Sequence, residues 1–178
     1  GAIAIAPVGD NTVICGGWGA NISDQGSGYQ LGLDAIRLAL EEIDGTKELS
    51  VLAQKLIGEK NPPQVLTASE YCDYRDKIRQ RLAPLDRLHI ASYAKTVCEC
   101  AEKGDAVSLS LYKKSGVDLA NLVCRAAAKT RLPLVNVIVT GGMVHAKKFW
   151  AKNFENHIKQ LYNIQKVFYI ADGIDIGM

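Results

Sequence analysis

Gly16-Gly17-Trp18-Gly19-Ala20-Asn21-Ile22-Ser23-Asp24-Gln25-Gly26-Ser27-Gly28-Tyr29 joins a predicted strand to a predicted helix. Its glycines let the backbone approach a bound group closely, Asp24 can accept two hydroxyl hydrogen bonds, and Trp18 offers a flat apolar face. This combination of groups is typical of a site that binds a sugar. A second interpretation stays open, because a glycine-rich turn that only caps a helix with Asp24 or Ser27 has the same spacing.

The segment resembles the GGWG…GDEGS signature of the BadF/BadG/BcrA/BcrD ATPase family. This family includes N-acetylglucosamine kinase-like proteins and belongs to the actin-like, hexokinase-type ATPase superfamily. The chain departs from the signature in having Ser23-Asp24-Gln25 where the family usually has Gly-Asp-Glu. The aspartate is kept, so the resemblance implies a sugar contact through Asp24, and it leaves open what Gln25 does. We expect Asp24 to be an accessible carboxylate in a surface cleft.

Two further stretches resemble the same family in the same order. Ile90-Ala91-Ser92-Tyr93-Ala94-Lys95, followed by Gly104-Asp105-Ala106, is similar to a helix-pair segment whose early alanine lies near the nucleotide. Val137-Ile138-Val139-Thr140-Gly141-Gly142-Met143 is similar to the adenosine motif, a buried strand that ends in a glycine pair. The resemblance therefore spans almost the entire chain.

The resemblance assigns residues to two ligands. It implies that the sugar is bound by Gly17, Trp18, Gly19 and Asp24, and that the adenosine is bound by Ala91, Gly141 and Gly142. Gly1 would remain from the turn that holds the phosphates of the nucleotide. No residue of this chain is expected to be catalytic or to bind a metal ion, because the family's catalytic base lies in a segment upstream of Gly1.

The implied activity is the ATP-dependent phosphorylation of an amino sugar, of the N-acetylglucosamine or N-acetylmuramate type, with ATP and Mg²⁺ as cofactors. This chain alone is then expected to be inactive. One alternative is an ATPase activator of the BadF/BcrA type, which should need interfacial cysteines with the geometry of a metal cluster. Another is a non-catalytic ligand-binding or oligomerisation module, which the absent catalytic segment and Gln25 favour.

Composition narrows the class of protein. A chain of 178 residues with 48% hydrophobic content can form one substantial core. Its 21 basic and 19 acidic residues do not favour nucleic acid or an anionic membrane as a partner. No apolar stretch resembles a membrane span or a signal peptide, so we expect a soluble, cytoplasmic protein.

The cysteines favour reduced thiols over a disulfide framework. They number five, at positions 15, 72, 98, 100 and 124, and an odd number with this spacing is not typical of a disulfide-rich fold. Cys98 and Cys100 lie two residues apart in a predicted helix, so they project about 200° apart and cannot share a metal ion. We therefore expect neither a zinc site nor an iron–sulfur site.

Turn residues and hydrophobic periodicity predict the order of the elements. Gly9-Asp10 separates two strands, and Asp105 is the expected N-cap of a long helix. The predicted elements are strands Ala2–Val8 and Asn11–Cys15, helix Tyr29–Ile43, an insertion over about 47–88 with helices Leu49–Ile57 and Tyr71–Leu82, helices Ile90–Glu102 and Ala106–Lys129, strand Leu134–Val139 covered on both faces, a helix from about His145 to Leu161, and strand Lys166–Ile170.

This order is close to the ribonuclease-H-like lobe of actin-like ATPases, an α/β fold, here with a helical insertion and without its first strand. That missing strand would lie between the strand beginning at Ala2 and the strand ending at Thr140, and its absence would leave two buried edges unpaired. We therefore predict that residues 1–178 form the C-terminal lobe of a two-lobed protein. The N-terminal lobe or another chain would complete the sheet, or the strands would rearrange. A homodimer is left open as a further partner.

Overall fold

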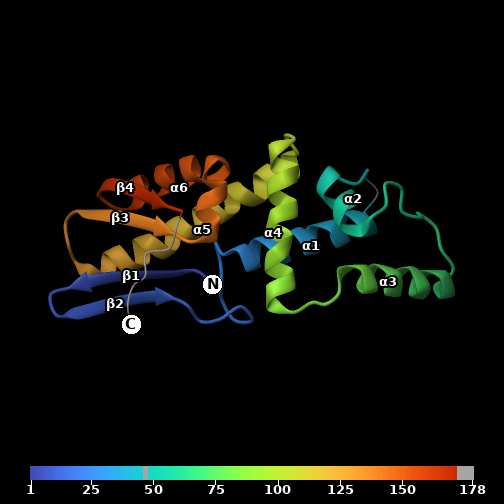
Figure 1. The fold of residues 1–178 in the computed structure, drawn as a ribbon, viewed down its shortest axis with the longest axis horizontal. Helices are drawn as coiled ribbons and strands as arrows, with labels where there is room; N and C mark the ends of the chain where they lie inside the picture. The colour runs from blue at the N-terminus through green and yellow to red at the C-terminus, as the bar shows by residue number, and fades with distance from the viewer. Residues whose placement is uncertain (46–47, 172–178) are drawn as a thin grey trace. The chain divides into compact units, whose positions relative to one another are not determined.

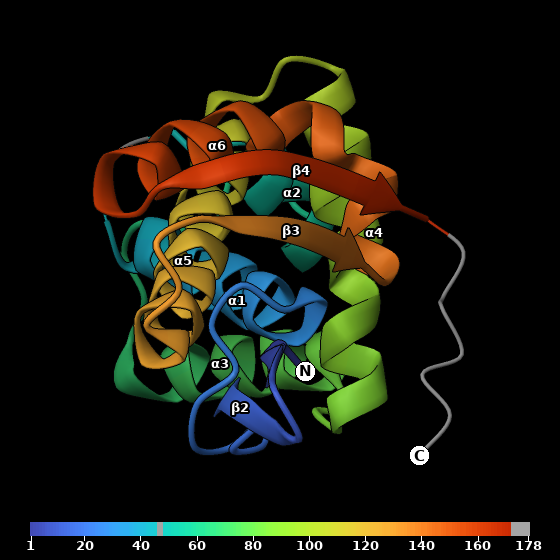
Figure 2. The same ribbon diagram turned by 90° about the vertical axis from the view of Figure 1, so that its left-hand side faces the viewer.

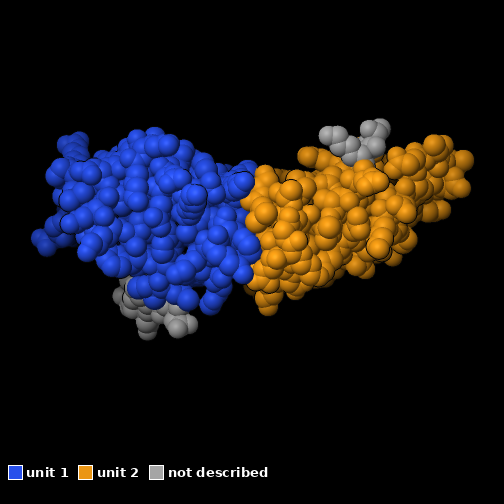
Figure 3. Space-filling view, turned by 90° about the horizontal axis from the view of Figure 1, so that it is seen from above, with its two compact units in different colours: residues 1–28, 112–178 blue, residues 29–111 orange. Residues whose placement is uncertain are grey.

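The computed structural model describes residues 1–45 and 48–171 (Figure 1). The chain divides into two compact units, which are coloured separately in Figure 3. The first unit contains residues 1–28 and those from 112 onward, and the second contains residues 29–111. The second unit extends beyond the expected helical insertion on both sides, and the expected start of that insertion, at about residue 47, lies outside the described residues.

The first unit contains two two-stranded sheets. β1 (Ile3–Val8) and β2 (Asn11–Gly16) form an antiparallel hairpin, as Gly9-Asp10 predicted, and β3 (Val135–Thr140) pairs in parallel with β4 (Ile164–Ile170). Figure 2 shows β3 and β4 side by side with their arrows in the same direction. Among the described residues each strand pairs with one neighbour, so β1 and β3 each have a free edge.

Two helices lie on one side of these sheets. α5 (Ala106–Thr130), which begins in the second unit, supplies Leu122 and Ala126 to a buried cluster with Cys15, and Ala2, Ala4 and Val13 pack against that cluster. α6 (Lys147–Leu161) follows the short 3₁₀ helix η1 (Gly142–Ala146) and buries Trp150, Phe154 and Ile158. The predicted single helix from His145 is therefore a 3₁₀ turn followed by an α-helix.

The other face of both sheets is exposed and carries several apolar side chains. The expectation that β3 is covered on both faces is wrong, because only Val137 is buried and its neighbour Ile138 is 57% exposed. Ile138 is paired in register with Phe168 of β4, which is also exposed. Ile3, Ile5 and Ile14 are exposed on the hairpin in the same alternating pattern.

The second unit is helical. It contains α1 (Gly28–Asp44), which begins at the end of the first unit, α2 (Val51–Ile57), α3 (Ala68–Leu82) and α4 (Arg87–Glu102). α1 and α4 approach closely, because a Cβ atom on Gly32 would clash with the carbonyl oxygen of Ile90. Side-chain caps begin three of these helices and α5; the capping residues are Ser50, Thr67, Asp86 and the predicted Asp105.

The cysteines are free thiols that differ in exposure. Cys15, Cys100 and Cys124 are buried, Cys98 is half-buried and Cys72 is exposed on α3. Burial raises the pKa of the Cys100 and Cys124 thiols, so both stay protonated at neutral pH. Across the described ranges, no helix has the length and apolar character that crossing a membrane requires.

Candidate functional site

The predicted sugar loop leaves β2 at Gly16 and enters α1 at Gly28. Its turn is closed by the amides of Ile22 and Ser23, which donate to the carbonyl oxygen of Gly19 at 3.1 and 3.0 Å. Gly17 and Gly19 have φ values of 73° and 98°, where only glycine is unstrained. Trp18 lies between them and is 71% exposed. The loop therefore presents an indole ring on an open surface, as a sugar-stacking role requires.

Asp24 lies inside this loop and is only 1% exposed, so the expectation of an accessible cleft carboxylate is wrong. Its Oδ1 accepts a hydrogen bond of 2.7 Å from the backbone amide of Ala2. Its Oδ2 is buried without a hydrogen-bond partner, and the amino nitrogen of Gly1 lies 3.8 Å away, beyond hydrogen-bond distance. The side chain of Asp24 is thus hydrogen-bonded to the backbone of Ala2.

Three of the predicted site residues meet at the backbone of Ala2. The amide of Gly17 donates to the carbonyl oxygen of Ala2 at 3.0 Å, while Asp24 accepts from its amide. A Cβ atom on Gly1 would clash with Oδ1 of Asp24, so position 1 is restricted to glycine in this geometry. Sequence reasoning missed Ala2, because an alanine that acts through its backbone gives no signal in its side chain.

The predicted adenosine turn follows β3 directly. Gly141 has a φ of 101°, and its carbonyl oxygen accepts a 2.9 Å hydrogen bond from the amide of Val144. Gly142 is exposed, and a Cβ atom there would meet no atom of the described residues within 4 Å. The start of β1, the end of β2 and the end of β3 lie at the same end of the first unit (Figure 1).

Two aromatic side chains, Trp150 and Tyr169, lie next to this turn, and they were not predicted from the sequence. The indole nitrogen of Trp150 donates to the carbonyl oxygen of Met143 at 2.9 Å. Tyr169 packs edge-on against Trp150 and donates its hydroxyl to Oε1 of Glu155 at 2.9 Å. Burial and this carboxylate raise the pKa of Tyr169, so its hydroxyl stays protonated. The Nζ atom of Lys147 lies 5.4 Å above the centre of the Tyr169 ring.

Ala91, the remaining predicted residue, lies on α4 in the second unit and is half-buried. The other predicted residues all belong to the first unit. Over the described residues, no group of three or more histidine, cysteine, aspartate and glutamate side chains is arranged to hold a metal ion. The predicted sugar and adenosine residues are thus divided between the two units, with Ala91 alone in the second.

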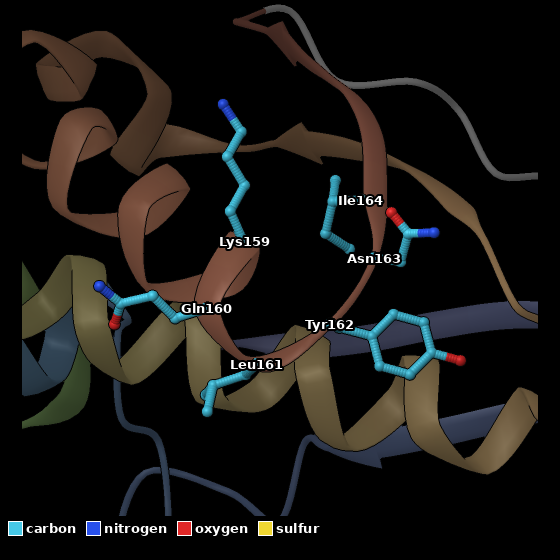
Figure 4. Close-up of a pocket in the computed structure, with 6 residues that line it drawn as sticks. All are labelled: Lys159, Gln160, Leu161, Tyr162, Asn163 and Ile164. Carbon is cyan, nitrogen blue, oxygen red and sulfur yellow. The ribbon is translucent and has the colours of Figure 1, made fainter.

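A surface pocket lies elsewhere in the first unit. It is lined by residues 159–164, where α6 ends and β4 begins (Figure 4). Tyr162 donates its hydroxyl to the carbonyl oxygen of Leu132. The side-chain amide of Asn163 donates to the carbonyl oxygen of Pro133 at 3.2 Å. These bonds connect the segments that precede β3 and β4, at the end of the strands opposite to Gly141. The pocket therefore contains none of the predicted site residues.

Comparison with a solved structure supports the fold. The chain is similar to the crystal structure of a protein proposed to be an N-acetylglucosamine kinase, from Chromobacterium violaceum, with a TM-score of 0.63 and 20% sequence identity. The similarity covers 91% of this chain and 50% of that one. At this level of identity the comparison concerns the fold alone, and it agrees with the predicted α/β class.

Comparison of sequences leads to the family. The chain is 26% identical over 164 residues to the N-acetylmuramic acid/N-acetylglucosamine kinase of Clostridium acetobutylicum, across 91% of this chain and 51% of the relative. The chain thus spans about half the length of these relatives. The sequence profile of the BadF/BadG/BcrA/BcrD ATPase family matches residues 1–177. This match extends over the glycine-rich loop, α4 and the turn after β3 alike, and the chain belongs to the BadF/BadG/BcrA/BcrD ATPase family.

Proposed function

We propose that the intact gene product transfers a phosphoryl group from ATP to a hydroxyl group of an amino sugar, of the N-acetylglucosamine or N-acetylmuramate type. The observation that carries this proposal is the meeting of Gly1 and Asp24 at the backbone of Ala2. The family resemblance assigns Gly1 to the phosphate turn and Asp24 to the sugar. Phosphoryl transfer needs the sugar hydroxyl and the phosphate to lie close together. Gly1 and Asp24 lie close together in the same way. The kinase activity of the Clostridium acetobutylicum relative supports the same reaction.

The sugar would bind across the loop from Gly17 to Asp24. Trp18 would cover an apolar face of the sugar ring, while the absence of side chains at Gly17 and Gly19 allows the ring to approach the backbone. The unpartnered Oδ2 of Asp24 would accept a sugar hydroxyl, which would satisfy a buried oxygen that otherwise has no donor. Because Oδ2 is buried, residues over it must move aside when the sugar binds.

The nucleotide would lie with its adenosine against Gly141 and Gly142 and its phosphates toward Gly1, and Ala91 in the second unit stays a predicted adenosine residue. The surroundings of Gly142 support this arrangement, since within the described ranges no atom lies within 4 Å of a Cβ placed there. ATP would enter as its Mg²⁺ complex, because Mg²⁺ is commonly held by substrate phosphates. We derive no catalytic step through the metal ion from this chain.

The catalytic base would belong to a part of the intact protein outside these residues. The chain spans about half the length of its relatives, and β1 and β3 each have an edge unpaired among the described residues. We propose that a strand of the N-terminal lobe, or of another chain, lies between β1 and β3 and completes a ribonuclease-H-like sheet. A second copy of this chain in a homodimer is the alternative source of that strand.

The test is an assay of phosphate transfer from ATP to a panel of amino sugars, made with the intact gene product. We expect transfer to N-acetylglucosamine or N-acetylmuramate. Hydrolysis of ATP without transfer to any sugar would favour an ATPase activator. Binding of a sugar without any use of ATP would favour a non-catalytic binding module. Either of these results would contradict the proposed kinase activity.

A further inference from the structure

The turn that follows β3 is short, and its first residues are exposed. The amide of Val144 donates to the carbonyl oxygen of Gly141 at 2.9 Å, and Val144 and Ala146 are buried. η1 is only five residues long, and its N-cap residue, Gly141, makes no side-chain capping bond. Both Gly141 and Gly142 are exposed. A short, exposed turn of this kind needs a second tether if it is to keep one conformation in the absence of a ligand.

Trp150 supplies that tether from α6. Its side chain is fully buried, and its indole nitrogen donates to the carbonyl oxygen of Met143 at 2.9 Å. The turn therefore has one carbonyl group fixed toward the protein interior. The opposite side of the turn, above Gly142, is left open.

The indole ring itself is held firmly. It packs edge-on against Phe154 and Tyr169, with ring centres 5.7 and 5.8 Å away. α5 packs closely against the backbone of Trp150, because a Cβ atom on Gly116 of α5 would lie only 2.7 Å from the carbonyl oxygen of Trp150. A donor with so little freedom fixes the position of the carbonyl group that it binds.

We infer that Trp150 is a positioning residue for the nucleotide: through Met143 it holds the turn at Gly141 and Gly142 in the shape that binds adenosine. The inference rests on the proposed function, which places adenosine at this turn. A turn already held in its bound shape loses less conformational freedom when ATP binds, so the hydrogen bond from Trp150 strengthens ATP binding without contacting ATP. It has no comparable effect on the sugar, whose proposed residues lie in the loop between β2 and α1.

The test is Trp150→Phe in the intact gene product, which keeps an aromatic ring in the core and removes the N–H donor. We expect the KM for ATP to rise by about tenfold, the loss typical of one hydrogen bond, with kcat and the KM for the sugar unchanged. The control is Ile158→Ala, a fully buried position two turns further along α6. This variant should lower the melting temperature and leave the KM for ATP unchanged.

A measurement on the unsubstituted protein covers the case in which Trp150→Phe does not fold. With ¹⁵N-labelled tryptophan, the slowly exchanging indole resonance of Trp150 should shift when ATP is added and stay in place when the sugar is added. An unmoved resonance, an unchanged KM for ATP in Trp150→Phe, or an equal rise in Ile158→Ala would overturn the inference. If the unsubstituted protein does not bind ATP at all, the proposed function fails first and the inference fails with it.

Discussion

At Asp24 the two carboxylate oxygens differ in their surroundings. Oδ1 accepts a hydrogen bond from the amide of Ala2, which holds the loop against the beginning of β1. Oδ2 has no hydrogen-bond partner within the described residues, and the amino nitrogen of Gly1 lies 3.8 Å from it. The residue type and its place in the glycine-rich loop were enough to single out Asp24 from the sequence. Its burial was not predictable, because the donor is a backbone amide 22 residues earlier in the chain.

Two substitutions at this position separate the structural role from the proposed sugar contact. Asp24→Asn keeps an oxygen for the amide of Ala2, so the intact protein should fold normally, but it removes the charged acceptor and should weaken sugar binding roughly ten- to a hundredfold. Asp24→Ala should also lower the free energy of unfolding by about 1–3 kcal/mol, since the amide of Ala2 loses its acceptor. Calorimetry measures both quantities. Normal sugar affinity in Asp24→Asn would mean that Asp24 only holds the loop.

The two glycines after β3 differ in what a methyl group would do. In Gly142→Ala the new Cβ meets no protein atom, so the melting temperature should stay unchanged while ATP binding weakens, because the methyl group enters the space proposed for adenosine. In Gly141→Ala the positive φ becomes strained by about 1–2 kcal/mol, so stability should fall as well. Thermal unfolding with and without ATP distinguishes the two variants. Unchanged ATP binding in Gly142→Ala would place adenosine elsewhere.

Among the elements, those with strong local signals were predicted well. The turn at Gly9-Asp10 gave the hairpin, and Asp105 was correctly predicted as the N-cap of α5. Boundaries without such a signal shifted: α3 begins at Ala68 and not at Tyr71, because Thr67 and Glu70 form a capping box that hydrophobic periodicity does not register. The burial of β3 was overestimated, since an apolar run does not say what covers each face.

The exposed apolar face of β3 and β4 gives a prediction at the same scale. If the rest of the intact protein covers this face, Ile138→Ser should lower the free energy of unfolding by about 1.5–3 kcal/mol, the value of burying an isoleucine. Val65→Ser is the control, because Val65 is 91% exposed in a loop of the second unit and should cost no more than about 0.5 kcal/mol. Denaturant unfolding measures the free energy of unfolding of both variants. If both variants lose the same small amount, nothing in the intact protein covers Ile138.

For the molecule as a whole, the length of the relatives sets the expectation. This chain covers about half of the kinase from Clostridium acetobutylicum. We expect the intact gene product to phosphorylate an amino sugar, and the 178-residue chain, assayed beside it at equal concentration, to show no transfer. Phosphate transfer by the 178-residue chain alone would place the catalytic base within these residues and contradict the proposed division of the site.

The uneven exposure of the cysteines has a practical consequence. Among the described residues Cys72 is the one exposed thiol, and it lies in the second unit, whereas Trp18 and Trp150 lie in the first. A maleimide dye on Cys72 that absorbs tryptophan emission would accept resonance energy from the tryptophans. The efficiency of this transfer depends on the distance between the dye and the tryptophans. It can be measured after ATP or sugar is added to the labelled protein, without any substitution in the chain.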